Sequence, residues 1–338
     1  MNGGSPPQLE GYQLLSELGH GGFGTVWYAE DDKGRGCAIK VLHRESVRVS
    51  DARERFEREA RILLELDHPC VVAIESFSTK PQPYIVMEFL RGPTLREVLE
   101  DRAYDKAPLH ADQVLRIITQ LCDAIAAAHA QGAVHRDLKP QNIIVVDENT
   151  LALKILDFGL ASLMNADLHN TTTLGRAIGS RMYMSPEQIR GGRVSPATDI
   201  FALSTILFEL CTLRRPWLRG SDGRPPLISE TNVATAGNGP HEVLTRILSG
   251  ERLAISDFRS DLPAAFDEVL KKGWAPQVSA RFEDVPSFAE AVTSALSVTP
   301  REITQTVAVT RAQTHLLPQE ELPSAEPSPG FSFTAFVP

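Results

Sequence analysis

A polar loop between two apolar segments carries the side chains best suited to chemistry. Residues 134–146, VHRDLKPQNIIVV, include an aspartate, a lysine two residues later and an asparagine three residues after that. Asp137 can accept a proton from an attacking hydroxyl and orient that hydroxyl. Lys139 can neutralise charge on a group in transit, and the amide oxygen of Asn142 can bind a metal. We interpret His135 as a core histidine held by backbone hydrogen bonds, because Asp137 already supplies the base.

A second aspartate follows twenty residues after Asp137. Asp157 stands in LDFGLA, between a strand-like segment and Gly159, where its carboxylate is free to bind Mg²⁺. Magnesium usually takes one or two protein carboxylates together with phosphate oxygens and waters. Asp157 and Asn142 are therefore the predicted metal ligands. Phosphoryl transfer requires mostly positioning and charge neutralisation, and these side chains supply both.

A glycine-rich motif, LGHGGFGTV at residues 18–26, contains Gly19, Gly21 and Gly24. In a dinucleotide-binding fold such glycines would follow a strand and open a helix. Here the β-branched and aromatic run TVWYAED follows, which predicts a returning strand. The glycines would then form the tip of a hairpin whose bare backbone can cover phosphates. An ordinary glycine-rich turn is the alternative that the motif alone leaves open.

A lysine on an apolar strand and a glutamate on the next helix form a candidate ion pair. Lys40, in CAIKVL, either extends its ammonium into water or points inward towards polyphosphate oxygens. The inward position would require a carboxylate partner, because an unpaired buried charge is costly. Glu59 is the candidate, since Phe56 and Leu63 place it on the apolar face of a predicted helix at 51–66. A solvated charge among many neighbours remains the alternative for Glu59.

The composition is that of a soluble globular protein. The 338 residues are 42% hydrophobic and 23% charged, enough for about two domains. A formal net charge of −9 leaves no basic excess, which argues against a general nucleic-acid binder. The most apolar stretch, 200–213, contains Glu209 and is shorter than the about 20 residues of a membrane span, so we expect a buried core helix there.

The cysteines and the N-terminus predict a cytoplasmic location. The four cysteines, Cys37, Cys70, Cys122 and Cys211, are scattered without a C-x-x-C pair, which disfavours a disulfide framework or a zinc site. The beginning of the chain, MNGGSPPQLEG, has no pattern of basic then apolar residues typical of a signal peptide.

The predicted elements fall into two parts. Up to about residue 90, short strand-like runs surround the single helix at 51–66, which suits a small sheet with one helix packed on it. Helical patterns dominate afterwards, interrupted by a Gly/Pro/Ser/Thr-rich loop at 219–240 that we expect to be mobile. We predict a disordered lead at 1–11 and a disordered tail at 299–338.

Taken in order, these motifs resemble those of the eukaryotic-like protein kinases, in the style of the bacterial serine/threonine branch. The matching motifs are GHGGFGTV, AIK, Glu59, HRDLKPQN, DFG and SPE. The similarity spans residues 12–298 and implies an α+β, two-lobed protein kinase fold. It implies an N-terminal lobe of strands with one main helix at 12–90 and a larger, mostly helical lobe at 91–298. ATP and Mg²⁺ are the implied cofactors.

The resemblance also assigns the site residues. The implied catalytic residues are Lys40, Glu59, Asp137, Lys139 and Ser180, and the implied nucleotide-binding residues are Leu18, Gly19, Gly21, Gly24, Val26, Ala38, Lys40, Met87, Glu88, Leu90 and Ile144. Met87 would be the gatekeeper beside a hinge at 88–90. Leu63, Ile74, His135 and Phe158 would stack as an apolar column linking the lobes. Asp199 would brace the His-Arg-Asp backbone, and Glu187 would pair with Arg281.

The acceptor implied by LKPQN is serine or threonine, since tyrosine kinases usually have Arg in place of Lys139. Ser180 stands where the family more often has Thr, and the hydroxyl is kept. Arg136 stands directly before Asp137, and an arginine at this place is typical of kinases that are switched by phosphorylation of the loop between Asp157 and Glu187. Its guanidinium can bind the phosphate and order that loop. Candidate autophosphorylation sites are Thr171, Thr172 and Thr173. A flexible polar loop that merely contains threonines is the alternative.

Two other readings of the chain stay open at this point. A kinase-fold scaffold could work through the tail, where Thr304, Thr306 and Thr310 could recruit a phosphothreonine-reading partner. A small-molecule phosphotransferase could use the same fold. The intact Lys40 and Asp157 argue against the scaffold, and DLKPQN and SPE argue for protein substrates. The sequence does not identify the physiological substrate.

Overall fold

The computed structural model describes residues 7–21, 24–43, 50–80, 82–158, 181–220, 222–230, 239–251 and 253–297. The chain divides into two units, Met1–Thr299 and Pro300–Pro338, and every described residue belongs to the first. The predicted tail lies outside the described residues, and the predicted domain limits remain predictions.

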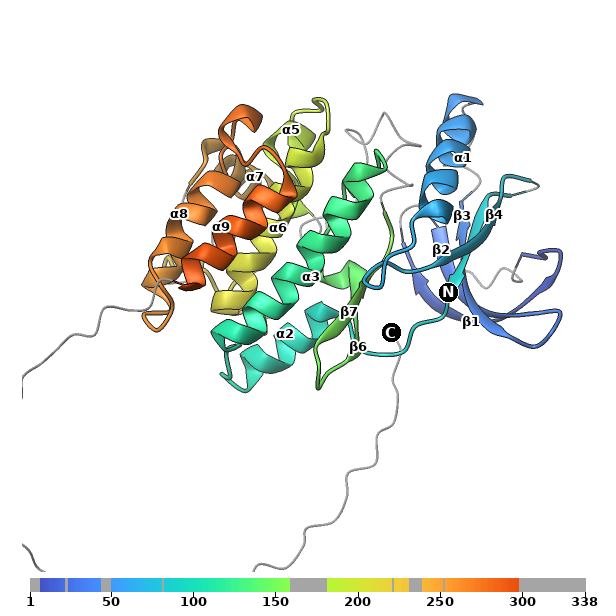
Figure 1. Cartoon of the computed structure of the whole chain (residues 1–338), viewed down its shortest axis with the longest axis horizontal. Coiled ribbons are helices and arrows are strands. Elements are labelled where there is room, and N and C mark those ends of the chain that lie inside the picture. Colours follow the sequence, from blue (N-terminus) through green and yellow to red (C-terminus); the bar gives the residue numbers. More distant parts are fainter. Residues whose placement is uncertain are drawn as a thin grey trace, which may run out of the picture. The chain divides into compact units, whose positions relative to one another are not determined.

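The N-terminal lobe is a five-stranded antiparallel sheet with a helix against it (Figure 1). The strands are β1 (Tyr12–His20), β2 (Gly24–Asp31), β3 (Gly36–Leu42), β4 (Ile74–Ser78) and β5 (Tyr84–Glu88), in the order β1-β2-β3-β5-β4. The helix α1 (Ser50–Glu65) packs against β4. The two-lobed kinase fold expected from the motifs is confirmed in this half by the small sheet and its helix.

Strand β3 shows how the sequence alternation divides the sheet into two faces. Cys37, Ile39 and Val41 point to one face, where they form a buried cluster. Ala38 and Lys40 point to the other face. Directly opposite residues share a face, and Val26 lies opposite Lys40. The predicted nucleotide-site residues of β2 and β3 therefore lie together.

The predicted disordered lead was wrong in its last part. Leu9 is buried in the cluster formed by Cys37, Ile39 and Val41 and forms an isolated bridge with Tyr12. The reason is the outer face of the sheet, whose apolar residues need a cover that a single leucine helps to provide. Residues 1–6 lie outside the described part of the chain.

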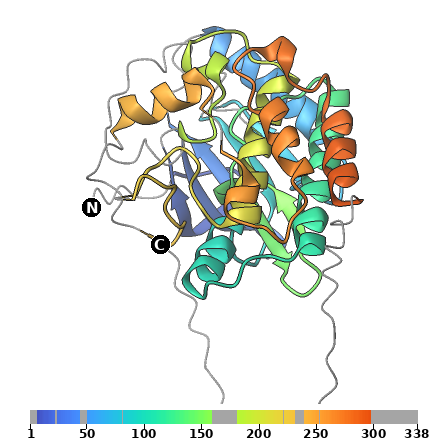
Figure 2. The ribbon, with the colours of Figure 1, turned by 90° about the vertical axis from the view of Figure 1, so that its left-hand side faces the viewer.

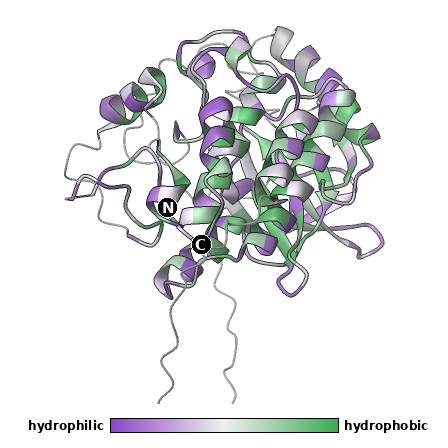
Figure 3. Cartoon of the chain, turned by 60° about the vertical axis from the view of Figure 1, so that its left-hand side comes forward, coloured by the Kyte–Doolittle hydropathy of each residue, from purple (hydrophilic) through white to green (hydrophobic). Residues whose placement is uncertain are grey.

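The C-terminal lobe consists mainly of helices, which lie in front of the sheet in Figure 2. Its helices are α2 (Leu95–Tyr104), α3 (Ala111–Ala130), α5 (Pro186–Ile189), α6 (Pro196–Thr212), α7 (Pro240–Ser249), α8 (Ala265–Gly273) and α9 (Val285–Ser297), with short 3-10 helices η2 (Pro140–Asn142), η5 (Ile255–Asp257) and η6 (Val278–Ala280). A two-stranded hairpin, β6 (Ile143–Asp147) and β7 (Ala152–Ile155), stands beside the other lobe. Most helices carry both polar and apolar residues along their lengths (Figure 3), as expected where one side packs inward.

Helix α6 forms the centre of this lobe. Every residue from Ala197 to Thr212 is buried, which confirms the predicted core helix at 200–213. Around it, Trp217 stacks on Phe201 with ring centroids 6.1 Å apart and contacts Trp274 at 4.8 Å. Among the described residues, no helix is long and apolar enough to span a membrane.

The region predicted as a mobile loop at 219–240 is ordered in part, which corrects that expectation. Ile228 is fully buried in the main core, and Leu227 forms a bridge with Arg214. The two apolar residues anchor this stretch because leaving them exposed would forfeit their burial energy. Residues 231–238 lie outside the described residues.

Candidate active site

The polar loop at 134–142 lies between α3 and β6 and ends in η2. One oxygen of Asp137, Oδ2, accepts hydrogen bonds from Lys139 Nζ at 2.7 Å and from Asn142 Nδ2 at 3.2 Å. Asn142 Nδ2 also donates to the backbone oxygen of Asp137 at 2.8 Å. The Asp137 side chain is 45% exposed. This arrangement fixes the carboxylate through one oxygen and leaves Oδ1 without a hydrogen bond from any described residue.

Helix α6 holds the backbone of this loop through one buried carboxylate. Asp199 accepts hydrogen bonds from the backbone N–H groups of His135 at 2.8 Å and Arg136 at 2.9 Å, and it contacts His129 Nε2 at 2.7 Å. The support stabilises the left-handed backbone of Arg136, whose φ is +66°. The predicted bracing role of Asp199 is confirmed.

His135 is architectural, as predicted. Its ring is fully buried, Nε2 contacts the backbone oxygen of Leu156 at 2.9 Å, and Phe158 packs on it at 4.6 Å. Burial lowers the pKa of His135 below its ordinary value, so the ring is neutral and takes no part in charge neutralisation.

Asp157 stands just beyond β7, where its backbone φ is +49°. Hydrogen bonding joins this segment to the polar loop, because Leu156 N donates to Asn142 O at 2.7 Å. Lys40 Nζ lies 2.8 Å from Asp157 Oδ2. Burial alone would raise the pKa of Asp157, but the Lys40 ammonium outweighs it and holds that pKa below its ordinary value. Asp157 is therefore ionised at neutral pH, as a metal ligand must be.

The ion pairs of the cleft differ from the predicted one. Glu59 does not pair with Lys40; it lies 3.1 Å from Arg136 Nη2, while Lys40 pairs with Asp157. Burial raises the pKa of Glu59, and the Arg136 guanidinium partly opposes that shift. Spacing identified Glu59 as facing the cleft but not which of two cations it meets. That choice depends on how α1 sits against the other lobe, which no local pattern encodes.

The apolar members of the predicted nucleotide-binding set, apart from Ile144, gather in one cluster. Ala38 and Met87 are buried together with Val72, and partly buried residues pack against them: Leu18, Val26, Phe89, Leu90 and Leu156. Ile144 lies beside this region, since Thr94 bridges to it just after the hinge. The side chain of Glu88 is engaged elsewhere, 2.5 Å from Lys154 Nζ. Its predicted role would therefore fall to its backbone.

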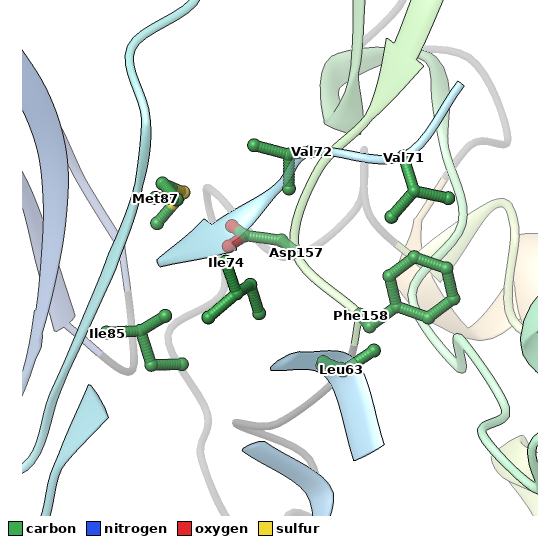
Figure 4. A pocket seen from close by; sticks show the side chains of 8 residues that line it. All are labelled: Leu63, Val71, Val72, Ile74, Ile85, Met87, Asp157 and Phe158. Carbon is green, nitrogen blue, oxygen red and sulfur yellow. The ribbon is translucent and has the colours of Figure 1, made fainter. Parts of the chain in front are cut away.

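A small apolar cavity of about 20 Å³ lies behind Met87 (Figure 4). It is lined by Leu63, Val71, Val72, Ile74, Ile85, Met87, Asp157 and Phe158. Leu63, Ile74 and Phe158 were predicted members of the apolar column between the lobes, and Phe158 continues to His135. The column is confirmed. The Asp157 carboxylate points to the β4 side of this cavity (Figure 4).

The glycine-rich motif is the tip of the β1-β2 hairpin, not the start of a helix. Gly19 pairs with Val26, and Gly21 N donates to Gly24 O at 2.9 Å. A Cβ on Gly24 would lie 2.4 Å from Val41 O, so this position requires glycine for the close approach of β3. A Cβ on Gly19 would meet no atom within 4 Å. Packing therefore does not explain Gly19, and the predicted role of its bare backbone in covering phosphates stays a prediction.

The chemistry of the oxygen donors fits Mg²⁺. Asp157 offers a carboxylate and Asn142 an amide oxygen, hard donors of the kind that magnesium takes alongside phosphate oxygens. Among the described residues no group of three or more His, Cys, Asp or Glu side chains could hold a metal ion. Ser180, Thr171, Thr172 and Thr173 lie outside the described residues.

Sequence reasoning missed one buried polar cluster, formed by Arg96, Tyr183 and Glu209. The available signal was Glu209, a carboxylate inside the most apolar stretch of the sequence, 200–213. The predicted pair between Glu187 and Arg281 is present, with 2.8 Å between Oε2 and Nη2.

The fold and the site define the class of protein, and comparison with known families agrees. Residues 12–238 match the family described as protein kinase domain. The chain therefore belongs to the protein kinase family.

Its similar proteins include bacterial serine/threonine kinases. The chain is 40% identical over 276 residues to the serine/threonine-protein kinase Pkn1 of Myxococcus xanthus, covering 77% of this chain and 39% of that protein. It is 35% identical over 294 residues to the probable serine/threonine-protein kinase PknB of Lactococcus lactis, covering 86% and 43%. The chain thus spans about two fifths of the length of these curated relatives. The crystal structure of the Mycobacterium tuberculosis PknI kinase domain has a TM-score of 0.61 at 24% identity, covering 87% of this chain and all of that one.

Proposed function

We propose that this chain transfers the γ-phosphoryl group of ATP to serine and threonine hydroxyls of proteins. The supporting observation is the juxtaposition at the cleft. Asp137 is held through one oxygen by Lys139 and Asn142, and Asn142 is joined through its backbone to the segment that ends in Asp157. The similarity to bacterial serine/threonine kinases supports the same assignment.

Each side chain has a distinct task in this proposal. Oδ1 of Asp137 accepts the proton of the acceptor hydroxyl. The hydroxyl oxygen forms a bond to the γ-phosphorus as the bond between that phosphorus and the ADP oxygen breaks. Lys139 neutralises charge on the phosphoryl group in transit. Lys40 reaches the polyphosphate from β3, and the apolar cluster around Ala38 and Met87 receives the adenine. Asp157 and Asn142 would hold Mg²⁺, which when bound neutralises charge on the phosphate oxygens.

The test compares incorporation of labelled phosphate by the wild type, Lys40→Met and Asp157→Ala. We expect incorporation by the wild type and a loss of about a thousandfold or more in both variants, because each removes a charge aimed at the triphosphate. Lys271→Met is the matched control, since Lys271 lies at the surface beside Glu268 and should leave the rate unchanged. Incorporation by Lys40→Met and Asp157→Ala at the wild-type level contradicts the proposal. Incorporation by none of the proteins, including the wild type, also contradicts it and would favour the scaffold.

Autophosphorylation at Thr172 or Thr173, in the loop between Asp157 and Glu187, is a second part of the proposal, supported by the position of Arg136. Its Nη2 is engaged by Glu59, but its buried Nε has no hydrogen-bond partner among the described residues. A phosphate on Thr172 or Thr173 would supply one. Peptide mass mapping of residues 166–181 after incubation with Mg-ATP tests this point, and an unmodified peptide contradicts it. Cytoplasmic location and recruitment of a phosphothreonine-reading partner by the tail stay predictions.

A further inference from the structure

The side chain of Glu88 lies where three segments of the chain meet. Its Oε1 accepts a hydrogen bond from Lys154 Nζ at 2.5 Å and another from Ala73 N at 2.7 Å. The backbone of Glu88 is held as well, because Glu88 N donates to Ala73 O at 3.0 Å. Glu88 ends β5, Ala73 directly precedes β4, and Lys154 lies on β7. The junction therefore joins the five-stranded sheet to the two-stranded hairpin of the other lobe.

Lys154 comes from a strand whose backbone is bonded on both sides. On one side β7 pairs with β6. On the other side Val72 N donates to Ile155 O at 3.0 Å, and Ile155 N donates to Cys70 O at 2.8 Å. Lys154 Nζ also donates to Val71 O at 3.3 Å. The ammonium is thus held at a defined place beside the Glu88 carboxylate.

The residues next to Glu88 belong to the predicted nucleotide cluster. Met87 and Glu88 are consecutive on β5, so their side chains point to opposite faces of the sheet. Met87 is buried with Ala38, and Leu90 packs against the same cluster. The Glu88 carboxylate therefore lies on the face away from that cluster, behind the hinge at 88–90 whose backbone is predicted to meet adenine. A contact that holds this carboxylate also sets the position of the hinge backbone.

The charge of Lys154 is needed to keep this arrangement. The two side chains are only partly exposed, 22% for Lys154 and 29% for Glu88. Without the ammonium, the Glu88 carboxylate would keep one printed donor, Ala73 N. It would turn towards water, because a partly buried charge without its counter-charge is costly. The hinge backbone would then lose one of the contacts that fix its position.

We infer that Lys154 is a positioning residue for the nucleotide: it holds Glu88 so that the backbone of the hinge at 88–90 meets the adenine ring in one position. This inference rests on the proposed kinase function. Lys154 touches neither the nucleotide nor the reacting atoms in this role. Its charge should therefore affect the binding of an adenine nucleotide and not the rate of phosphoryl transfer.

The test is Lys154→Met, which removes the ammonium and keeps an unbranched apolar stem. Calorimetry with Mg²⁺ and non-hydrolysable analogues of ATP and GTP gives the two Kd values without phosphoryl transfer. We expect the Kd of the ATP analogue to rise about fivefold, the effect of one lost hydrogen bond to a charged group. The Kd of the GTP analogue should stay within about twofold, because guanine has an acceptor oxygen where adenine has an amino donor. The kcat at saturating ATP should also stay within about twofold.

Two further variants make the comparison specific. Lys154→Arg keeps a positive charge beside Glu88 and should return the Kd of the ATP analogue to within about twofold of the wild type. Arg116→Met is the matched control, since Arg116 Nη1 donates to Thr150 O at 3.3 Å in the turn of the same hairpin and makes no printed contact with the hinge. It should leave both Kd values unchanged.

Three outcomes in Lys154→Met would overturn the inference. They are an unchanged Kd of the ATP analogue, an equal rise for both analogues, which would mark a general loss of structure, and a higher kcat with unchanged Kd values, which would mean that the pair restrains the lobes. A wild type that binds the ATP analogue but phosphorylates no protein would instead reject the proposed function itself.

Discussion

The cleft has two sides, and their ion pairs behave differently. On the helical side, Asp199 holds the polar loop at 134–142 and Arg281 holds Glu187, both as the family resemblance implied. On the sheet side, Lys40 and Glu59 face the cleft as expected, but each meets another partner. The first side is fixed by buried groups with several hydrogen bonds each. The second consists of part-exposed cations and carboxylates, and we expect their pairing to change when nucleotide binds.

The largest expected effect follows from breaking the fixed side. Arg281 is fully buried at its side chain and donates to Glu187, Ala275 O and Ala197 O. Arg281→Met removes the cation that pairs with the nearly buried Glu187 carboxylate. We expect the free energy of unfolding to fall by about 3–5 kcal/mol, because the carboxylate is left without a counter-charge. Urea denaturation measures it. The double variant Glu187→Gln/Arg281→Met should recover most of the loss; a loss of less than about 1 kcal/mol in the single variant would mean that this side is not fixed.

A smaller effect should mark the exchangeable side. A double-mutant cycle on the free energy of unfolding, with Glu59→Gln and Arg136→Met, should give a coupling of about 1–2 kcal/mol without nucleotide. The cycle with Glu59→Gln and Lys40→Met should give none. With Mg²⁺ and a non-hydrolysable ATP analogue, we expect the coupling to shift towards the Lys40 cycle.

The matched control for that experiment is Arg61→Ala. Arg61 pairs with Glu57 on the exposed side of α1, 2.6 Å apart, so this variant changes the helix without changing the cleft. It should cost about 0.5 kcal/mol or less, with or without the analogue. A strong coupling between Glu59 and Lys40 in the absence of nucleotide would show that the pairs do not exchange.

The smallest expected effect is on the pH dependence of the free energy of unfolding, to which the two cleft carboxylates contribute with opposite signs. The pKa of Asp157 is lowered from 3.8, so its ionised form stabilises the fold above that pH, and the contribution is lost as pH falls through the lowered pKa. The pKa of Glu59 is raised from 4.5, so its contribution is present below that pH and is lost as pH rises through the raised pKa.

Urea denaturation at several pH values can separate these contributions. Relative to the wild type, Asp157→Asn should be less stable at neutral pH and approach it in acid below 3.8. Glu59→Gln should instead gain on the wild type as pH rises above 4.5. Parallel curves for the two variants would contradict the opposite signs.

Local patterns predicted most of the fold because the features that they encode are local. The apolar run predicted a strand around Lys40, which is β3. Helical spacing predicted the bounds of α1 to within one residue and placed Glu59 on its apolar face. The roles of Asp199 and Arg281 came only from the resemblance, since their partners lie far away in the sequence.

What the sequence did not predict depends on how elements meet. The partner of Glu59 is set by the placement of α1. The burial of Leu9 and Ile228 is set by apolar surfaces that exist only after folding. The sequence gives no sign that Arg96 is more than a solvated charge on an amphipathic helix. Its contact with Glu209, 113 residues away in the sequence, exists only in the folded chain.

The aromatic centre of the helical lobe has a practical consequence for spectroscopy. Two of the three tryptophans, Trp217 and Trp274, lie against each other around α6, whereas Trp27 lies on β2 of the sheet. In a Trp27→Phe protein, tryptophan fluorescence would come only from the helical half. The difference between its fluorescence spectrum and that of the parent would report on the sheet half alone, giving each lobe its own optical signal without any added dye.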